Sequence, residues 1–324
     1  AGVDAYNIAI GYNSGMSIST GAYNTLMGGL AGDALTTGTG NVAIGYQALS
    51  AEDGNGRNIA VGVNALRDLN AGADAYNVAV GYEAGKLVSS GVNNVLIGGF
   101  AGEALTTGAS NVAIGHAALN AEDGNGKNVA IGYHALLAQN AGADAYNVAI
   151  GYNAGLSVTT GNYNILIGGT AGDALTTGNE NIAIGFSALG AEDSGGKNIA
   201  IGYKSLEVLD AGADGNNVAV GRDSGRAMST GIQNTIVGAL CGDALTTGDN
   251  NIIIGYNAAA SAVGVDNEIT LGDANISAFR CADQSIAALS DGRDKSEVEE
   301  SPYGLEFINK LKPVKFTWDF RPEH

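Results

Sequence analysis

Most of the chain repeats one short pattern: Asn, an aliphatic residue, any residue, a second aliphatic residue and Gly. The first copy is Asn7-Ile8-Ala9-Ile10-Gly11. Two aliphatic residues separated by one position are typical of a short β-strand with two side chains on its buried face. The Asn of successive copies stands at positions 7, 24, 41, 58, 77, 94, 111, 128, 147, 164, 181, 198, 217, 234, 251 and 267.

The step from one Asn to the next is seventeen within each group of four, nineteen between groups and sixteen at the end. A fixed period of this length indicates a stacked-repeat architecture. Seventeen residues are too few for a parallel crossover through a full helix, but they suffice for one coil with two or three short strands. The pattern therefore predicts an all-β fold for residues 1–272, a parallel β-solenoid of 17-residue coils grouped in 70-residue modules of four coils. Such a stack, at about 4.8 Å per coil, would be a shaft roughly 75 Å long.

We expect the aliphatic residues of the pattern to point into the coil, so that Ile114, for example, is buried. The residue between them is often Ala, as at Ala9, Ala43, Ala60 and Ala79. We expect this small side chain to face away from the core, where it permits another chain to approach closely. Gly lets the chain turn after the strand, and the Asn side chains, which bond readily to nearby backbone, are expected to stack in a ladder.

An aromatic residue often follows the Gly of the pattern. Such a stripe is typical of rings that stack between coils, and the alternative is a surface that holds sugars. The residues concerned are Tyr12, Tyr46, Tyr82, Tyr133, Tyr152, Phe186, Tyr203 and Tyr256.

The period breaks near the end of the chain. Residues 273–290 are interpreted as a neck, and residues 291–324 have the charges, prolines and Trp of a different fold. There, Ser301-Pro302 predicts the start of a helix, and alternating apolar residues over 314–318 predict a strand. Because so short an α+β segment cannot bury a stable core alone, we interpret it as the beginning of a C-terminal domain, completed by further sequence or by partner chains.

The chain has 15 basic and 33 acidic residues, a formal net charge of −18, of which residues 1–290 account for −16. An acidic rod is repelled by nucleic acid and by anionic membranes, and the sequence has no apolar run long enough for a membrane-spanning helix. The 51 Gly residues lack the three-residue period of collagen. We therefore expect no nucleic-acid partner and no membrane insertion.

Two cysteines, Cys241 and Cys281, do not suggest a disulfide framework. Cys241 stands where the other modules have Ala, so we expect a small buried residue. The turns Asp53-Gly54-Asn55-Gly56 and Asp123-Gly124-Asn125-Gly126 have the oxygen-rich character of calcium loops. However, the full calcium-loop pattern is missing and the third copy, Asp193-Ser194-Gly195-Gly196, departs from it. We expect no metal site and no cofactor.

The repeats resemble the head repeats of trimeric bacterial adhesins and the shafts of bacteriophage tail fibres. The resemblance rests on Asn-Val-Ala-Ile-Gly at 41–45, 111–115 and 147–151, and on Asn-Ile-Ala-Ile-Gly at 7–11, 181–185 and 198–202. It implies a parallel homotrimer, either intertwined or side by side. The 17-residue spacing is longer than that of the adhesin heads, so the handedness of the solenoid does not carry over.

The segment Leu289-Ser290-Asp291-Gly292-Arg293-Asp294-Lys295 resembles the start of the endosialidase-type intramolecular chaperone domain that ends many phage tail fibres and spikes. Segments 302–313 and 316–321 fit the same domain opening. The resemblance implies a domain that trimerises, templates the folding of the shaft and is released by self-cleavage. It also implies that Ser290 is the nucleophile and Lys295 the base, with Asp291 and Arg293 at neighbouring motif positions.

The chemistry of Ser290 and Lys295 is consistent with a single turnover of self-cleavage. A serine hydroxyl becomes a nucleophile when a base takes its proton, and a Lys of lowered pKa is such a base. Attack on the Leu289 carbonyl gives an unstrained ring, so Leu289–Ser290 is the expected bond for attack within one chain. Ser290–Asp291 is the alternative if a neighbouring chain attacks. A plain turn at Ser-Asp-Gly, without chemistry, is the competing interpretation.

Four functions fit these observations to different degrees. The leading interpretation is an extracellular structural protein of a phage tail fibre, without catalytic activity in the shaft. Its partners would be further copies of itself, an upstream fibre or baseplate protein, and a host surface polysaccharide or receptor. The alternatives are a bacterial trimeric surface adhesin, a polysaccharide-degrading tail spike with paired carboxylates, and an ice-binding solenoid, which would need Thr on every coil. Residues 1–6 closely match residues 71–76, so we expect the chain to open inside a repeat, after a missing anchor.

Overall fold

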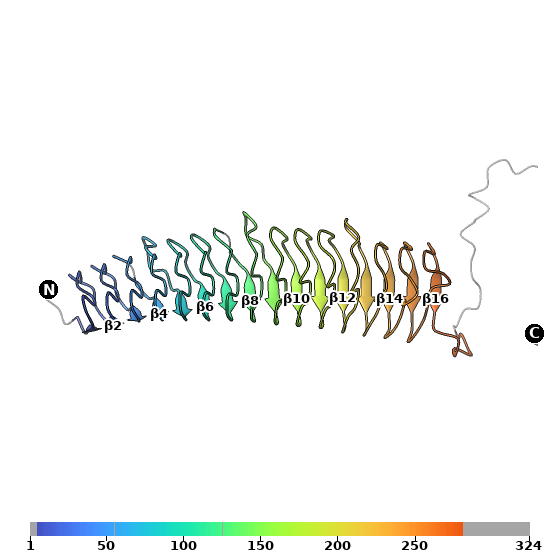
Figure 1. Cartoon of the computed structure of the whole chain (residues 1–324), viewed down its shortest axis with the longest axis horizontal. Coiled ribbons are helices and arrows are strands. Elements are labelled where there is room, and N and C mark those ends of the chain that lie inside the picture. Colours follow the sequence, from blue (N-terminus) through green and yellow to red (C-terminus); the bar gives the residue numbers. More distant parts are fainter. Residues whose placement is uncertain (1–4, 55, 125, 281–324) are drawn as a thin grey trace, which may run out of the picture. The chain divides into compact units, whose positions relative to one another are not determined.

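The structure is a computed structural model and describes residues 5–54, 56–124 and 126–280. All of the described strands belong to one parallel sheet, in which they follow one another in sequence order (Figure 1). No helix occurs among the described residues. The predicted all-β, parallel β-solenoid is therefore confirmed for this part of the chain. The strands are β1 (Ile8–Ile10), β2 (Thr25–Met27), β3 (Val42–Ile44), β4 (Ile59–Val61), β5 (Val78–Val80), β6 (Val95–Ile97), β7 (Val112–Ile114), β8 (Val129–Ile131), β9 (Val148–Ile150), β10 (Ile165–Ile167), β11 (Ile182–Ile184), β12 (Ile199–Ile201), β13 (Val218–Val220), β14 (Thr235–Val237), β15 (Ile252–Ile254) and β16 (Ile269–Leu271).

The register follows the aliphatic positions of the pattern to the last coil, where Ile269 and Leu271 stand one residue further from the Asn than in the other coils. Ile252 pairs with Ile269, so the last step of the ladder is seventeen, although the step from Asn251 to Asn267 is sixteen. Glu268 therefore takes the place of Asn in the final coil, and its backbone N–H donates to Asn251 Oδ1 at 2.9 Å. The period is thus kept to the end of the sheet, although the sequence pattern slips by one residue.

Only one side of each coil is a strand, whereas the sequence led us to expect two or three short strands per coil. The other residues of the coil form turns and bends. Gly15 N–H donates to Ala31 C=O at 3.0 Å and Gly32 N–H donates to Ala48 C=O at 2.9 Å, and equivalent bonds recur along the stack. The turn side is therefore also hydrogen-bonded from coil to coil, without the geometry of a strand.

The strand residues face the opposite way from our prediction. The middle residue, such as Ala43 or Ala113, is fully buried inside the coil. Its two aliphatic neighbours, such as Val112 and Ile114, are only partly buried and face outward. The predicted burial of Ile114 is therefore wrong. The physical reason is the narrowness of a 17-residue coil, in which the turn packs directly over the strand and leaves room for only the central side chain of each strand.

The coil interior alternates large and small side chains with the four-coil period of the modules. In the second coil of a module a large residue lies at the strand centre and Gly lies in the turn, where a Cβ added at Gly102 would be 2.8 Å from Leu96. In the third and fourth coils of the first three modules Ala lies at the strand centre and a buried Leu lies in the turn. Large and small residues thus exchange places so that each coil is filled. The large strand-centre residues are Leu26, Leu96, Leu166 and Ile236 of the second coils and Ile253 of β15, and the buried turn residues are Leu49, Leu66, Leu119, Leu136, Leu189 and Leu206.

The Asn residues form a buried ladder, as predicted. Asn94 Oδ1 accepts a hydrogen bond from Asn111 N–H at 2.9 Å, and Asn94 Nδ2 donates to Gly108 C=O at 2.8 Å. The N–H of Asn94 in turn donates to Asn77 Oδ1 at 2.9 Å. The amide oxygens therefore join successive coils at the start of the strand, and in the first and second coils of each module the amide nitrogen also satisfies a Gly carbonyl of the next coil.

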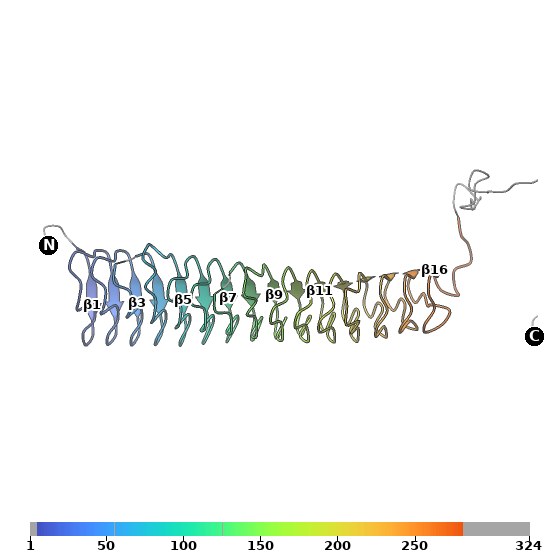
Figure 2. The ribbon, with the colours of Figure 1, turned by 90° about the horizontal axis from the view of Figure 1, so that it is seen from above.

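The sheet twists along the stack. The strands stand side by side in Figure 1, and in Figure 2 the arrows near β1 are seen face-on whereas those near β15 are seen edge-on. The right-handed twist of individual strands produces such a rotation between neighbours. The outward face of the sheet therefore winds about the long axis of the described coils.

Substitutions at adjacent positions of β7 test this orientation. Ala113→Asp places a charge in a closed apolar interior, where an unpaired ion costs about 3–5 kcal/mol. We therefore expect this coil not to fold in the variant. Ile114→Asp places the same charge on the outward face and should lower the unfolding free energy of a single chain by about 1 kcal/mol. Thermal unfolding followed by circular dichroism compares the two, and equal losses would contradict the orientation.

Removal of one rung of the ladder should also destabilise the chain. Asn94→Ala leaves the buried N–H of Asn111 and the C=O of Gly108 without partners, and each such group costs about 1–3 kcal/mol. We expect a loss of about 2–4 kcal/mol in a denaturant titration. The matched control is Asn140→Ala, at an exposed turn position, which should change the unfolding free energy by less than about 0.5 kcal/mol. Similar losses for both variants would mean that the ladder does not stabilise the stack.

Candidate functional site

The outward face of the sheet carries two columns of aliphatic side chains. They are the first and third residues of β1–β16, and no residue of these strands is charged. Among these outward positions, Thr25 and Thr235 are the only polar residues. Interior members such as Ile97 and Ile150 remain 37% and 36% exposed after the coils on both sides have covered them. The two columns, which we call the aliphatic strip, thus form a continuous apolar surface.

The aliphatic strip is large for a surface in contact with water. Sixteen strands spaced about 4.8 Å apart, each about 10 Å long, give an area of roughly 750 Å². The largest apolar patch on a soluble monomer is typically about 300–600 Å², and larger ones mark interaction sites. The strip therefore has the size and the chemistry of an interaction surface.

This strip is the feature that sequence reasoning missed. A signal for it was present, because the middle position of the strands holds Leu26, Leu96 and Leu166, whereas an outward position accepts Thr25 and Thr235. A core column does not normally alternate with unpaired hydroxyls. The distribution of Thr would have indicated which positions face water.

An aromatic stripe lies along one edge of the aliphatic strip. Tyr82, Phe100, His116, Tyr133 and Tyr152 follow one another with ring centroids 5.3 to 5.7 Å apart. The predicted stacking between coils is therefore confirmed for His116, Tyr133 and Tyr152 and for Phe186 and Tyr203, whereas Phe100 meets Tyr82 and His116 edge to face. Because stacked rings cover one another's faces, they offer mainly their edges to solvent. A sugar that lies flat on an aromatic ring needs an uncovered face, so this stretch does not favour the sugar-binding alternative.

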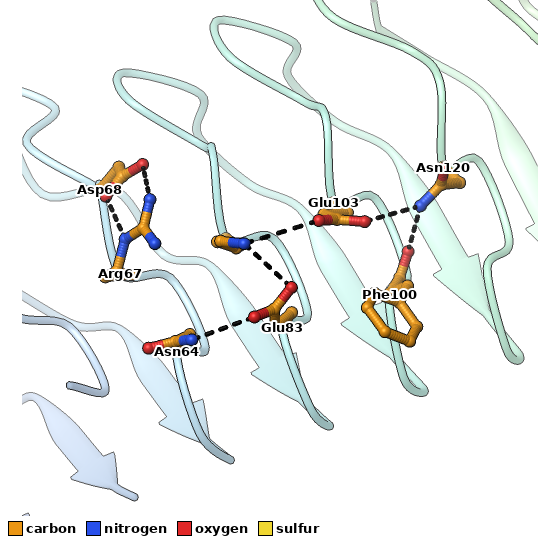
Figure 3. A network of polar contacts seen from close by, with 8 residues as sticks. Asn64, Arg67, Asp68, Glu83, Phe100, Glu103 and Asn120 are labelled. Carbon is orange, nitrogen blue, oxygen red and sulfur yellow. Dashed lines mark hydrogen bonds and ion pairs between the residues drawn. The ribbon is translucent and has the colours of Figure 1, made fainter. Parts of the chain in front are cut away.

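A network of polar side chains crosses from the first module into the second (Figure 3). Glu83 accepts hydrogen bonds from Asn64 Nδ2 at 3.1 Å and from Lys86 Nζ at 3.0 Å. Lys86 also lies 3.8 Å from Glu103, whose carboxylate accepts from Asn120 Nδ2 at 3.2 Å. The Lys86 ammonium holds the pKa of the Glu83 carboxyl below its usual range. These contacts link the side chains of four successive coils, from the coil of Asn64 to the coil of Asn120.

Ion pairs recur at the longer connection that follows each of the first three modules. Lys127 Nζ donates to Asp144 Oδ2 at 2.6 Å and to Tyr146 Oη at 2.9 Å. Asp144 Oδ1 accepts from Gly126 N–H at 3.1 Å, and the hydrogen bond from Lys127 lowers the pKa of the Asp144 carboxyl. These contacts fasten the two extra residues of the longer step. The equivalent pairs are Arg57–Asp74 and Lys197–Asp214.

One group of carboxylates lies in the described turns. Oxygens of Glu192, Asp193 and Asp210 lie within 4.8 Å of one another. Glu192 is buried, and its two oxygens accept hydrogen bonds from Gly195 N–H at 2.7 Å and from Ala211 N–H at 3.4 Å. Burial raises the pKa of this carboxyl. The backbone thus occupies both oxygens of Glu192, and the earlier modules have Asn in place of Asp210, so the group does not repeat.

The residues predicted from sequence to cleave the chain, Ser290, Asp291, Arg293 and Lys295, lie outside the described residues. The helix and the strand expected after residue 300 lie outside them as well. The structure therefore tests neither the proposed nucleophile nor its base.

Cys241 is buried, as the sequence indicated. Its Sγ lies 3.1 Å from the Ile253 carbonyl oxygen, and burial raises the pKa of the thiol to about 11. A thiol that stays protonated at neutral pH is a poor nucleophile, so Cys241 acts as a core residue.

Comparison with known proteins shows no match to a family model, to a curated protein or to a solved structure. Among the described residues there is no helix of the length and hydrophobicity that spanning a membrane requires. A function is therefore proposed from the geometry of the stack and from the sequence.

The buried carboxyl of Glu192 should make stability depend on pH. Because its pKa is raised in the folded chain, folding favours the protonated form. The resulting stabilisation is complete below the ordinary Glu pKa of about 4.3 and is lost as pH rises through the raised value. The wild-type chain should therefore gain melting temperature relative to Glu192→Gln as the pH is lowered from about 7 to about 4.5.

The matched control for this pH series is Glu180→Gln, at an exposed side chain. Its melting temperature should run parallel to that of the wild type across the same pH range. A Glu192→Gln curve that also runs parallel would show that burial of this carboxyl has no energetic effect.

Proposed function

We propose that this chain is a structural shaft protein of an extracellular fibre, specifically of a bacteriophage tail fibre, in which three copies assemble. The observation that supports this most directly is the unbroken ladder of β1–β16, in which successive coils keep one register. Stacked repeats of this kind produce length and an extended surface. A shaft that spaces an adhesive tip from a particle requires both properties.

The described shaft offers little support for an enzyme. A polysaccharide-degrading spike needs two carboxyl groups that flank a substrate cleft. A hollow lined by Glu207, Arg226 and Asp243 comes nearest to this arrangement. Glu207 is held there in ion pairs with Lys204 and Arg226, both at 2.8 Å. A carboxylate engaged by two cations is a poor general acid, which favours the structural function.

In this proposal the shaft is joined to an upstream fibre or baseplate protein and meets a host polysaccharide or receptor through an adhesive part of the fibre. The net charge of −18 keeps long rods apart and soluble. Residues 291–324 are the opening of a trimerising chaperone domain. That role rests on the resemblance of segment 289–295, with Ser290 as nucleophile and Lys295 as base.

The proposed tail can be tested by cleavage. When the chain is expressed with a complete C-terminal domain, it should yield two fragments, cut beside Ser290. Ser290→Ala should leave one full-length chain because the attacking hydroxyl is gone, and Lys295→Ala should slow the cut by about 10²-fold or more because the general base is lost. Gel electrophoresis and the mass of the smaller fragment measure the outcome.

Two results would count against this role. The shaft of the Ser290→Ala protein should still fold, since templating requires the presence of the domain and not its removal. Deletion of everything from residue 291 onward before folding should instead give insoluble or monomeric shaft, because register slips are easy in a regular repeat. Soluble trimers from that deletion, or an uncut chain with Ser290 intact, would exclude a self-cleaving chaperone.

A further inference from the structure

We propose that the aliphatic strip of β1–β16 is the surface along which further copies of this chain pack against one another. The inference rests on the proposed multi-chain shaft and adds the surface that joins its chains. The occupant of the strip is a second copy of the same solenoid, aligned along the stack. The small Ala residues that we first expected at this contact are instead buried inside each coil.

The area of the strip suits a stable contact between proteins. Its size of roughly 750 Å² is close to the roughly 800 Å² that each partner contributes to an interface of standard size. All but two of its outward residues, Thr25 and Thr235, are apolar. Closing the strip would therefore remove mainly aliphatic surface from water, at about 25 cal/mol for each Å².

The periodicity of the strip indicates a partner that is itself a repeat. Its Ile and Val side chains form ridges that recur at every coil, about 4.8 Å apart. A compact partner would cover a few coils and leave the rest exposed. A ladder with the same spacing can place its side chains between those of the first ladder at every coil, as two facing sheets do. This chain itself supplies such a ladder.

Electrostatics also favours contact at this face over the other sides of the coil. Each chain carries a net charge of −18, so two copies repel one another at most orientations. The strands that form the strip contain no Asp, Glu, Lys or Arg. Contact there desolvates no charge, whereas contact through the acidic turns would bury ions without partners.

The aromatic stripe widens the same surface. Tyr82, Tyr133 and Tyr152 lie beside the strip and are 51%, 44% and 58% exposed. Aromatic residues are enriched at protein interfaces because they combine a large apolar area with a polar tip. Ring contacts with neighbouring coils already restrict these side chains, so little further side-chain freedom is lost when a second chain covers them.

The twist of the sheet determines how the copies must be arranged. The strip changes direction progressively from β1 to β15 (Figure 2). If two copies lay side by side as straight rods, their strips would face each other over only part of the length, because each strip turns away as the sheet twists. Copies that keep the strip covered throughout must wind around a common axis, so the intertwined form of the proposed trimer follows from this surface.

The test introduces charge into the strip at two coils that are not adjacent. The variant Ile97→Lys/Ile131→Lys changes two outward positions, separated by the coil that contains Ile114. Lys side chains on opposing copies would repel one another and would be desolvated in the contact. We expect multi-angle light scattering to show a multi-chain mass for the wild type and the single-chain mass of 32.4 kDa for this variant at the same concentration.

The matched control adds the same charge elsewhere on the coil. Asn70→Lys/Asn140→Lys changes two exposed turn positions that lie outside the strands and should keep the wild-type mass. Circular dichroism verifies that each variant is folded. A gentler variant, Ile97→Thr/Ile131→Thr, uses a residue that the strip already accepts at Thr25 and Thr235. It should raise the concentration at which the chains dissociate by at least about tenfold.

The outcomes separate the surface from the proposed function. If the Lys variant keeps the wild-type mass, the strip is not the contact, although a multi-chain shaft survives. If the wild type itself is a folded single chain, the proposed trimer fails and the inference fails with it. If the Lys variant does not fold, the Thr variant decides: an unchanged dissociation concentration would overturn the inference, and an increase would support it.

Discussion

The buried Asn amide controls how each coil lies on the next. Its oxygen accepts the N–H of the following Asn, and at positions such as Asn94 its nitrogen also reaches the carbonyl of a Gly in the next coil. Both bonds lie in a closed interior, where an unmade bond is costly. If a coil had one residue more or fewer between its Asn and the next, the amide and the backbone groups it bonds would no longer lie opposite one another. The Asn ladder therefore maintains the register of the whole sheet. The longer step after each of the first three modules is accommodated by a separate turn, fastened by contacts such as Lys127–Asp144.

A narrow coil has a second effect, on the distribution of apolar side chains. Each coil encloses one strand-centre residue and a few turn residues, so the interior of a module is filled by Ala and by single Leu side chains that exchange places with Gly. The remaining Ile and Val residues of the strands cannot fit inside. They lie on the outward face, where they create an apolar surface that a single chain does not cover. The dimensions of the coil thus determine both the packing of its interior and the apolar character of its outward face.

Much of the fold followed from the spacing of the pattern, because register is a property of the backbone and repeats with the chain. The parallel stack, the module length and the Asn ladder were all predicted. The orientation of the strand was not, because alternation alone does not say which of two faces is buried when both are apolar. In the last coil the aliphatic residues Ile269 and Leu271 set the register, and the pairing of Ile252 with Ile269 puts Glu268, not Asn267, at the Asn position of the ladder. The cleavage residues around Ser290 were inferred from a resemblance in a segment that the structure does not describe, so they stay a prediction.

The exchange of large and small residues inside the coils bears on how the length of this protein changes during evolution. A coil with Leu at its strand centre packs against coils that have Gly in the turn at that level. Loss of one coil would therefore bring together two coils whose interior side chains do not fit, even though their Asn amides could still bond to one another. Loss or duplication of a whole 70-residue module would leave every kind of contact in place. A change by whole modules would therefore lengthen or shorten the stack in steps of four coils, roughly 19 Å each, with no new kind of packing.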